Sequence, residues 1–176
     1  MGAWTFDPYH TQVEFSAKHL GMMTVRGHFS EVTSTGELHP EAPERSRFEI
    51  SIKTDSIQTH NAQRDVDLRS SNFLETAQHP TITYRSTKIE PAGSDRFVIT
   101  GDLTIKGNTH PFTMSAVNLG EFNDPKMGHR IGYSAEGTID RKDFGMNFDM
   151  MLDHRLIVSH EIKVQIEGEL VEAAAA

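Results

Sequence analysis

Apolar and polar residues alternate along most of this chain, and eight stretches follow this two-residue period. Side chains along a strand point alternately to opposite faces, so each stretch would have one dry face and one wet face. The expected strands lie near Trp4–Lys18, Thr24–Leu38, Arg47–Ile57, Thr81–Glu90, Arg96–Ile105, His110–Glu121, His129–Arg141 and Ser159–Val171. Turn-forming residues separate most of them, and long helical patterns between strands are missing. The sequence therefore predicts an all-β, eight-stranded antiparallel barrel or a sandwich rather than a parallel sheet.

Small residues recur on the expected dry face. Eight strands suffice to close a barrel, whose interior is then either just filled by side chains or holds one small ligand. The glycines could leave room for a guest, or could mark bulges and sharp bends. The alanines have no such structural role, so the whole set favours a hollow interior. The predicted inward small residues are Ala17, Gly27, Gly101, Ala116, Ala135, Gly137 and Gly168.

One region, Thr59 to His79, lacks both strict alternation and the turn formers glycine and proline. Thr59 can cap a short helix that runs to about Leu68, between the third and fourth strands. Asn72 then starts a second helical turn, with Glu75 as a capping-box partner, and Pro80 ends it. We expect this segment to lie across one end of the barrel. The side chains predicted to face inward are Ala62, Val66, Leu68, Phe73 and Leu74, and another short helix or turn is expected at His19–Met22.

Composition limits the class of protein. A chain of 176 residues suits one domain, expected over residues 1–172 with a disordered tail at 173–176. The net charge of −8 disfavours nucleic acid as a partner, and the lack of cysteine excludes disulfides and thiolate metal sites. The sequence shows neither a signal peptide nor an apolar run long enough to cross a bilayer. The simplest expectation is a cytoplasmic protein, or a periplasmic or secreted one if a leader was removed.

The order and spacing of several short motifs resemble the YceI-like family of lipocalin-like, polyisoprenoid-binding proteins. The matching blocks run through nearly the whole chain. They are Trp4–His10, Val13–Phe15, His19, Gly27–Phe29, Asp55–Thr59, Arg64–Leu68, Asn72–Phe73, His79–Pro80, Gly101–Thr109 and Asp140–Gly145.

This resemblance implies an eight-stranded lipocalin-like barrel with a helical segment between strands three and four. It also implies a bound isoprenoid lipid, such as a polyprenyl phosphate or an isoprenoid quinone, carried or stored without catalysis or a further cofactor. Many relatives look secreted or periplasmic, and this chain departs from them in showing no leader. Other amphiphiles, such as fatty amides or apolar antibiotics, remain an alternative, because such a pocket would accept many linear apolar chains. Transient membrane contact and a homodimer are left open.

Large apolar residues on the dry face are the candidates for the cavity wall, although for any one of them taken singly ordinary core packing is the simpler explanation. They are Val13, Phe15, Phe29, Ile50, Ile52, Phe73, Tyr84, Leu103, Met114, Tyr133, Phe144 and Val164. The segment Phe144–Leu152 holds two phenylalanines and three methionines, which suit either a pliable lip at the cavity mouth or a loop packed on the rim.

Basic residues near strand ends are the candidates for binding a ligand head group. His19 is the best of them, although it could equally be a hydrogen-bonded histidine at a turn. Arg64 could instead pair with Asp65, and Arg141 could instead pair with Asp143. The full set is His19, Arg64, Arg69, Arg85 and Arg141.

Metal and hydrolase chemistry have weaker support. The ten histidines include none at the tight spacing of a helical or hairpin metal site. The sequence also has no Gly-x-Ser-x-Gly elbow, phosphate-binding glycine loop or His-Glu-x-x-His motif. We therefore expect no metal site and no enzyme, while an enzyme acting on a bound lipid stays the third alternative.

Overall fold

Eleven strands form one strongly curled antiparallel sheet in the computed structural model, which describes residues 3–173. The sheet strands are β1 (Trp4–Phe6), β2 (Gln12–His19), β3 (Met23–Phe29), β4 (Val32–Glu37), β5 (Arg47–Lys53), β6 (Ile57–Gln58), β7 (Thr81–Pro91), β8 (Arg96–Ile105), β9 (Asn108–Asp124), β10 (Gly128–Asp140) and β13 (Glu161–Glu172). A separate hairpin joins β11 (Met151–Leu152) to β12 (Arg155–Leu156), and the helical elements are α1 (Ala62–Arg69) and the 3-10 turns η1 (Pro43–Arg45), η2 (Thr54–Ser56) and η3 (Arg141–Phe144).

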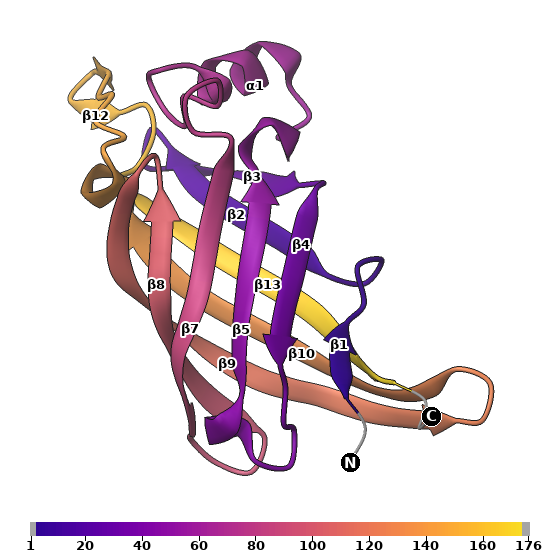
Figure 1. The fold of residues 1–176 in the computed structure, drawn as a ribbon. Helices are drawn as coiled ribbons and strands as arrows, with labels where there is room; N and C mark the ends of the chain where they lie inside the picture. The colour runs from indigo at the N-terminus through magenta and orange to yellow at the C-terminus, as the bar shows by residue number, and fades with distance from the viewer. Residues whose placement is uncertain (1–2, 174–176) are drawn as a thin grey trace.

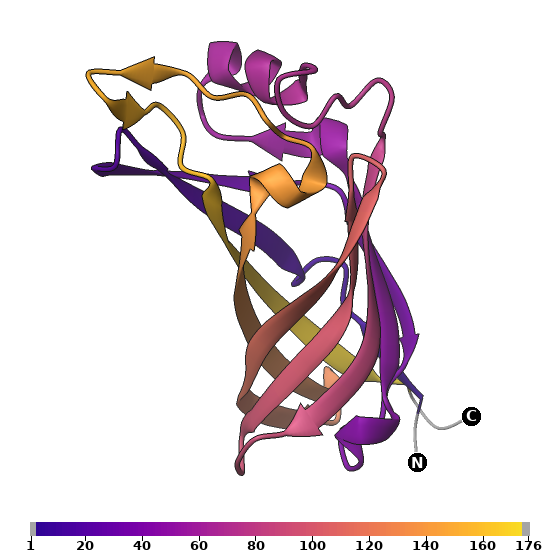
Figure 2. The ribbon, with the colours of Figure 1, turned by 90° about the vertical axis from the view of Figure 1, so that its left-hand side faces the viewer.

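The strand order explains the curl. The sheet runs β4-β5-β7-β8-β9-β10-β13-β2-β3-β6, with β1 added beside β13. The long strands β9, β10 and β13 form the back, while α1 and the β11–β12 hairpin project from one end (Figure 1). The 3-10 turn η1, strand β1 and the last residues of β13 lie at the opposite end, which the rotated view also shows (Figure 2). We call these the α1 end and the η1 end.

The sequence prediction of an all-β antiparallel fold with one short helix is confirmed, but the count of eight strands is wrong. The sheet curls into a half-barrel, and its two end strands in the described residues, β4 and β6, are not paired with each other. Each of the first three expected strands is divided in two. At one corner, the link between β3 and β4 bonds to the link between β5 and β6, through Ser30 N to Ser56 O (3.2 Å) and Glu31 N to Ser56 Oγ (3.1 Å). A strand that turns a corner must break its regular ladder, and residue alternation continues through such a break without marking it.

The helical segment is shorter than expected. Asn61, not Thr59, caps α1, since its side chain accepts a hydrogen bond from Arg64 N (3.0 Å). Residues 71–74 form turns rather than a helix, and Glu75 takes a left-handed conformation (φ 50°) that no helix continues. Leu68 packs against the core, and Phe73 and Leu74 are buried in it as predicted. Val66 is exposed but lines a large cavity, whereas Ala62 is exposed and does not line it. The segment His19–Met22, for which a short helix or a turn was expected, forms a turn.

Three of the predicted inward glycines do not create space, and the sequence interpretation is wrong for them. A Cβ atom added to Gly101 would lie 2.6 Å from Tyr84 Cζ, and one added to Gly137 would lie 2.6 Å from Phe112 Cζ. Phe15 covers Gly27 in the same way. Each glycine therefore makes room for an aromatic ring of the barrel's own wall.

The first and last described residues are bonded to each other. Ala173 N donates a hydrogen bond to Ala3 O (2.7 Å), and the rest of the expected tail, residues 174–176, lies outside the described residues. Within residues 3–173, no helix has both the length and the apolar character that a membrane span requires.

Candidate ligand-binding cavity

A cavity of about 920 Å³ occupies the barrel from its middle to the α1 end. This volume lies at the upper end of the range usual for small-molecule sites. Strands from nearly every part of the sheet contribute apolar side chains to its wall, so the alternating pattern is the direct source of a dry surface. Polar residues gather where α1 and its flanking loops meet the cavity, including Asn61, Arg64 and Asp67.

Thirteen of the fifteen predicted site residues line this cavity. They are Val13, Phe15, His19, Phe29, Ile50, Ile52, Arg64, Phe73, Tyr84, Leu103, Met114, Arg141 and Val164. Whether they bind a ligand stays a prediction, but the structure brings them together around one hollow.

The other two predicted residues lie elsewhere. Tyr133 faces inward as expected but lines a second, smaller cavity toward the η1 end. Alternation predicts which face a side chain takes, and it does not predict its height along the barrel. Phe144 is buried beside His110, with ring centroids 5.2 Å apart, and does not line the large cavity.

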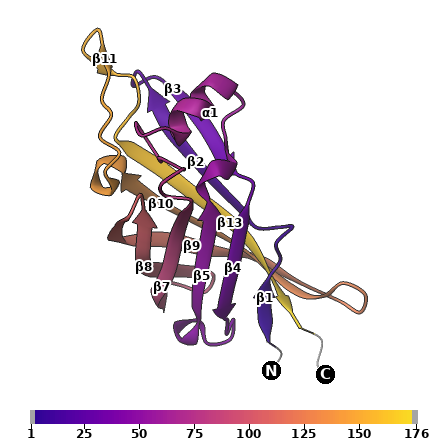
Figure 3. The same cartoon turned by 45° about the horizontal axis from the view of Figure 1, so that its top comes forward.

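α1 is fixed over the cavity by a buried network around Thr59. Thr59 donates its backbone N–H (3.0 Å) and its hydroxyl (2.5 Å) to Asp65 Oδ1. Arg64 donates from Nε to Thr59 Oγ1 and from Nη2 to Thr59 O, both at 2.7 Å. The expected Arg64–Asp65 alternative is therefore wrong in its detail: both side chains bind Thr59 instead of forming an ion pair with each other. Figure 3 tips this end of the molecule forward and shows α1 and β11 projecting from it.

Arg141 anchors the opposite side of the cavity mouth. Its guanidinium is almost fully buried and donates to the carbonyl oxygens of Met146 (2.6 Å), Ser159 (3.0 Å) and Val158 (3.1 Å). It also bonds Asp149 Oδ1 at 3.0 Å, so its acidic partner is Asp149 and not the predicted Asp143. The charge is satisfied within the protein, which makes Arg141 a structural part of the wall.

Asp149 is held by two cations, Lys142 and Arg141, and by His160. Lys142 donates to its Oδ2 at 2.7 Å, and His160 and Arg141 both reach Oδ1. The hydrogen bond from Lys142 is the largest cause that lowers the pKa of this carboxyl well below its usual range. An ionised Asp149 therefore ties together the loop after η3 and the loop before β13.

The remaining head-group candidates divide by position. His19 sits at the rim, where its Nδ1 lies 3.1 Å from Ile157 O, so it is a hydrogen-bonded histidine at a turn that also lines the cavity. Lys18, which the sequence analysis did not single out, lines the same rim and donates to Thr24 Oγ1 (2.8 Å). Arg69 and Arg85 do not line the cavity: Arg69 bonds the backbone of Asp55 and Ile57, and Arg85 pairs with Glu49.

The Phe144–Leu152 segment combines both of its predicted roles. Phe144 is buried in the rim, whereas Met146, Phe148 and Met150 line the cavity. Met150, Met151 and Leu152 are about half exposed. The T-shaped contact between Phe148 and Phe73, with ring centroids 5.7 Å apart, joins this segment to the loop that follows α1.

Several wall residues escaped the sequence analysis although their signal was present. Ile82, Ile105 and Phe112 each lie two positions from a residue that was selected, on the same strand face. The polar α1 residues that reach the cavity had no such signal, because sequence does not show how a short helix is oriented over a barrel.

Among the residues of the cavity wall, Tyr84 has a clearly raised pKa. Tyr84 donates to Phe112 O (3.2 Å), and burial raises the pKa of its phenol, which stays neutral. Outside the cavity, Asp7, His10 and Glu169 lie close enough for a metal ion, the one such group found in residues 3–173. Arg130 already bonds both carboxylates, at 3.0 Å from Asp7 Oδ2, so a cation is present there.

Comparison with known proteins identifies the family. The YceI-like domain model matches residues 4–170. The chain belongs to the YceI-like domain family. A UPF0312 protein of Pseudomonas paraeruginosa is 38% identical over 141 residues, covering 80% of this chain and 73% of that protein. Protein YceI of Escherichia coli O157:H7 is 39% identical over 141 residues, which again cover 80% of this chain and 73% of that protein.

Solved structures share the fold. The YceI protein of Campylobacter jejuni, 27% identical, has a TM-score of 0.77 and covers 89% of this chain and 90% of its own. BcnA of Burkholderia cenocepacia reaches a TM-score of 0.81 at 19% identity, covering 94% of this chain and 99% of its own. A domain of Saccharophagus degradans, described as a polyisoprenoid binding domain, reaches 0.68 at 13% identity, covering 98% of this chain and all of its own. The two lower identities bear on the fold alone.

Proposed function

We propose that this YceI-like protein binds one long isoprenoid lipid, a polyprenyl phosphate or an isoprenoid quinone, and acts as a carrier or store rather than as an enzyme. The observation that carries the proposal is the 920 Å³ cavity, apolar along most of its strand wall, with its polar residues gathered mainly on the rim at the α1 end. A ligand with a long apolar tail and one polar end matches that division. The polyisoprenoid description of the Saccharophagus domain adds support from the same fold.

Magnitudes favour the tail as the main source of affinity. Each buried methylene contributes ~0.8 kcal/mol before costs, and large ligands realise about 0.3 kcal/mol per non-hydrogen atom. A head-group hydrogen bond to a charged side chain adds only ~1.5–3 kcal/mol. Tail length should therefore decide how tightly the lipid binds, and the rim residues should decide which head group is preferred.

The first experiment is to identify what co-purifies. Extraction of the purified protein with organic solvent, followed by mass spectrometry, should recover an isoprenoid. Recovery of fatty amides or other amphiphiles would favour the second candidate function, the capture of amphiphiles other than isoprenoids. The mostly apolar strand wall allows it, because such a wall does not select one kind of chain. Recovery of nothing apolar, together with failure to take up added isoprenoids, would contradict both.

A matched pair of variants tests the location of binding. Val25 lines the cavity, whereas its neighbour Arg26 on β3 is exposed on the outer face. Val25→Trp should fill part of the cavity and lower the amount of lipid bound, and Arg26→Trp should bind as the wild type does. Equal uptake by both variants would place the ligand elsewhere.

The rim cations distinguish the two head groups. Arg64 lines the cavity and Arg85 is 73% exposed and pairs with Glu49. If the ligand is a polyprenyl phosphate, Arg64→Gln should weaken its binding about tenfold or more, corresponding to one charge-assisted bond. Binding of a quinone should weaken less, since it loses only the contribution of the Arg64–Thr59 bonds that hold α1, and Arg85→Gln should leave both affinities unaltered.

Catalysis would require conversion of the bound lipid by the purified protein, which product analysis after prolonged incubation would reveal. The expected cytoplasmic location, and the alternative of a periplasmic or secreted protein, stay predictions that cell fractionation would test. Size-exclusion chromatography would do the same for the homodimer.

A further inference from the structure

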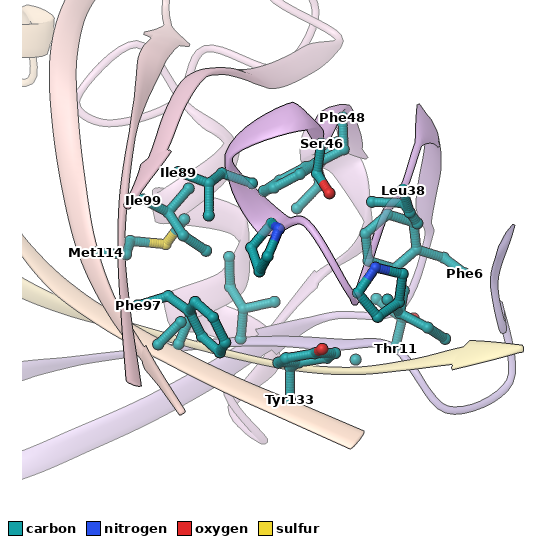
Figure 4. Close-up of a pocket in the computed structure, with 18 of the residues that line it drawn as sticks. Phe6, Thr11, Leu38, Ser46, Phe48, Ile89, Phe97, Ile99, Met114 and Tyr133 are labelled. Atoms are coloured by element: carbon teal, nitrogen blue, oxygen red, sulfur yellow. The ribbon is translucent and has the colours of Figure 1, made fainter. Parts of the chain in front are cut away.

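A second cavity of about 110 Å³ lies beyond the large one, toward the η1 end of the barrel (Figure 4). Three residues, Ile50, Met114 and Ile166, line both cavities. Only a layer of side chains therefore separates the two spaces, and the layer lies at the end of the large cavity away from α1.

Two facing alanines explain why this space stays open. Ala116 on β9 pairs directly with Ala135 on β10. The row across the sheet continues from Ala116 to Phe97 on one side and from Ala135 to Ile166 on the other. Large side chains thus flank a pair of methyl groups, and the missing volume is the smaller cavity.

The smaller cavity suits hydrocarbon rather than water. The hydroxyls of Thr11 and Ser46 at its edge are already bonded within the protein: Thr11 Oγ1 donates to Asp7 O (2.8 Å), and Ser46 Oγ accepts from His39 N (2.8 Å). His39 Nε2 lies 3.0 Å from Glu37 Oε1. Tyr133 contributes a ring that packs against Phe97, with centroids 6.1 Å apart. Apolar cavities of this size stay dry and accept small apolar guests.

Met114 is the movable member of the separating layer. It is 1% exposed, and its unbranched side chain can change rotamer without a shift of β9. We propose that the smaller cavity is a subsite for the far end of an isoprenoid tail, reached when Met114 turns aside. Ala116 and Ala135 then set the longest tail that binds at full affinity. This inference rests on the proposed function.

The experiment compares Ala135→Leu with Ala17→Leu, a matched change in the large cavity alone. Affinities are measured for polyprenyl monophosphates of increasing length, from geranyl to octaprenyl. Ala135→Leu should leave the shorter members unchanged and weaken the longer ones about tenfold, the value of one excluded prenyl unit. Ala17→Leu should weaken short and long members alike.

A measurement on the wild type keeps the inference testable if Ala135→Leu folds poorly. An octaprenyl monophosphate with a photoreactive group on its last prenyl unit should crosslink to Phe97 or Tyr133, which line only the smaller cavity. Crosslinks confined to Val25 or Leu103, or equal losses for all tail lengths in Ala135→Leu, would overturn the inference while leaving the proposed function standing. Failure of the wild type to bind any member would overturn both.

Discussion

The ring of Phe15 occupies the position that a side chain on Gly27 would need. The two residues are direct partners on β2 and β3. A Cβ atom added to Gly27 would lie 2.8 Å from Phe15 Cε1 and 2.9 Å from Thr59 Cγ2, closer than real Cβ contacts come. The glycine thus lets an aromatic ring lie against the barrel wall next to the Thr59 network that holds α1.

Gly27→Ala should destabilise the protein by about 1–3 kcal/mol, the usual cost of overpacking a core. Chemical denaturation measures this as a lower free energy of unfolding. Phe15→Leu in the same chain should recover part of the loss, since the two changes act on one contact and are not additive.

Gly132→Ala is the matched control, because a Cβ there would meet Leu119 Cβ at an ordinary 3.6 Å. Its effect should stay within about 0.5 kcal/mol. Equal effects of Gly27→Ala and Gly132→Ala would show that the Phe15 ring does not require the glycine.

Arg141→Met should lower the free energy of unfolding by about 3 kcal/mol. The change removes donors to three backbone carbonyl oxygens and to Asp149, and buried acceptors without partners each cost ~1–3 kcal/mol. Denaturant titration of the ligand-free protein measures the loss.

Lys142 provides the comparison for Arg141, because it binds the other oxygen of the same Asp149 but is 37% exposed. Lys142→Gln should cost less than about 1 kcal/mol, as exposed ion pairs do. A cost for Lys142→Gln as large as that for Arg141→Met would mean that Asp149 pairing, and not burial of the guanidinium, stabilises the rim.

The sequence predicted the dry face of each strand well, and its failures share one physical origin. Leu103 and Met114 face the cavity because alternation is a local property of extended chain. The break between β3 and β4 at Ser30–Glu31 depends instead on contacts between distant segments, and so does the ion pair of Arg141 with Asp149. Tyr133 was placed on the correct face but in the wrong cavity, for the same reason.

Asp7 should make stability depend on pH in the acid range. The hydrogen bond from His10 is the largest cause that lowers the pKa of this buried carboxyl from 3.8 to about 2, with help from Tyr9 N and Arg130. A lowered pKa in the folded state adds stability above the unfolded value and loses it as pH falls through the folded value.

Asp7→Asn should therefore cost about 2 kcal/mol at about pH 5, and the difference from wild type should shrink toward zero near pH 2. Urea denaturation across this range gives the comparison. A difference that stays constant with pH would show that the carboxylate charge is not the stabilising feature.

His129 should give the opposite pH dependence near neutrality. Its ring is hydrogen-bonded to the carboxylates of Glu172 (2.9 Å) and Glu121. These two hydrogen bonds raise the pKa of His129, and the bond to Glu172 is the larger cause. A raised pKa in the folded state adds stability that is complete below the unfolded value of about 6.5 and is lost as pH rises through the folded value. His129→Gln should therefore be most destabilised relative to wild type at about pH 6, with the difference narrowing at higher pH.

Trp4, the single tryptophan, lies 4.8 Å from the His129 ring, so its fluorescence should follow the same titration. Glu172→Gln should shift that titration further toward ordinary histidine values than Glu121→Gln does, and a fluorescence profile unchanged by either variant would contradict the assignment.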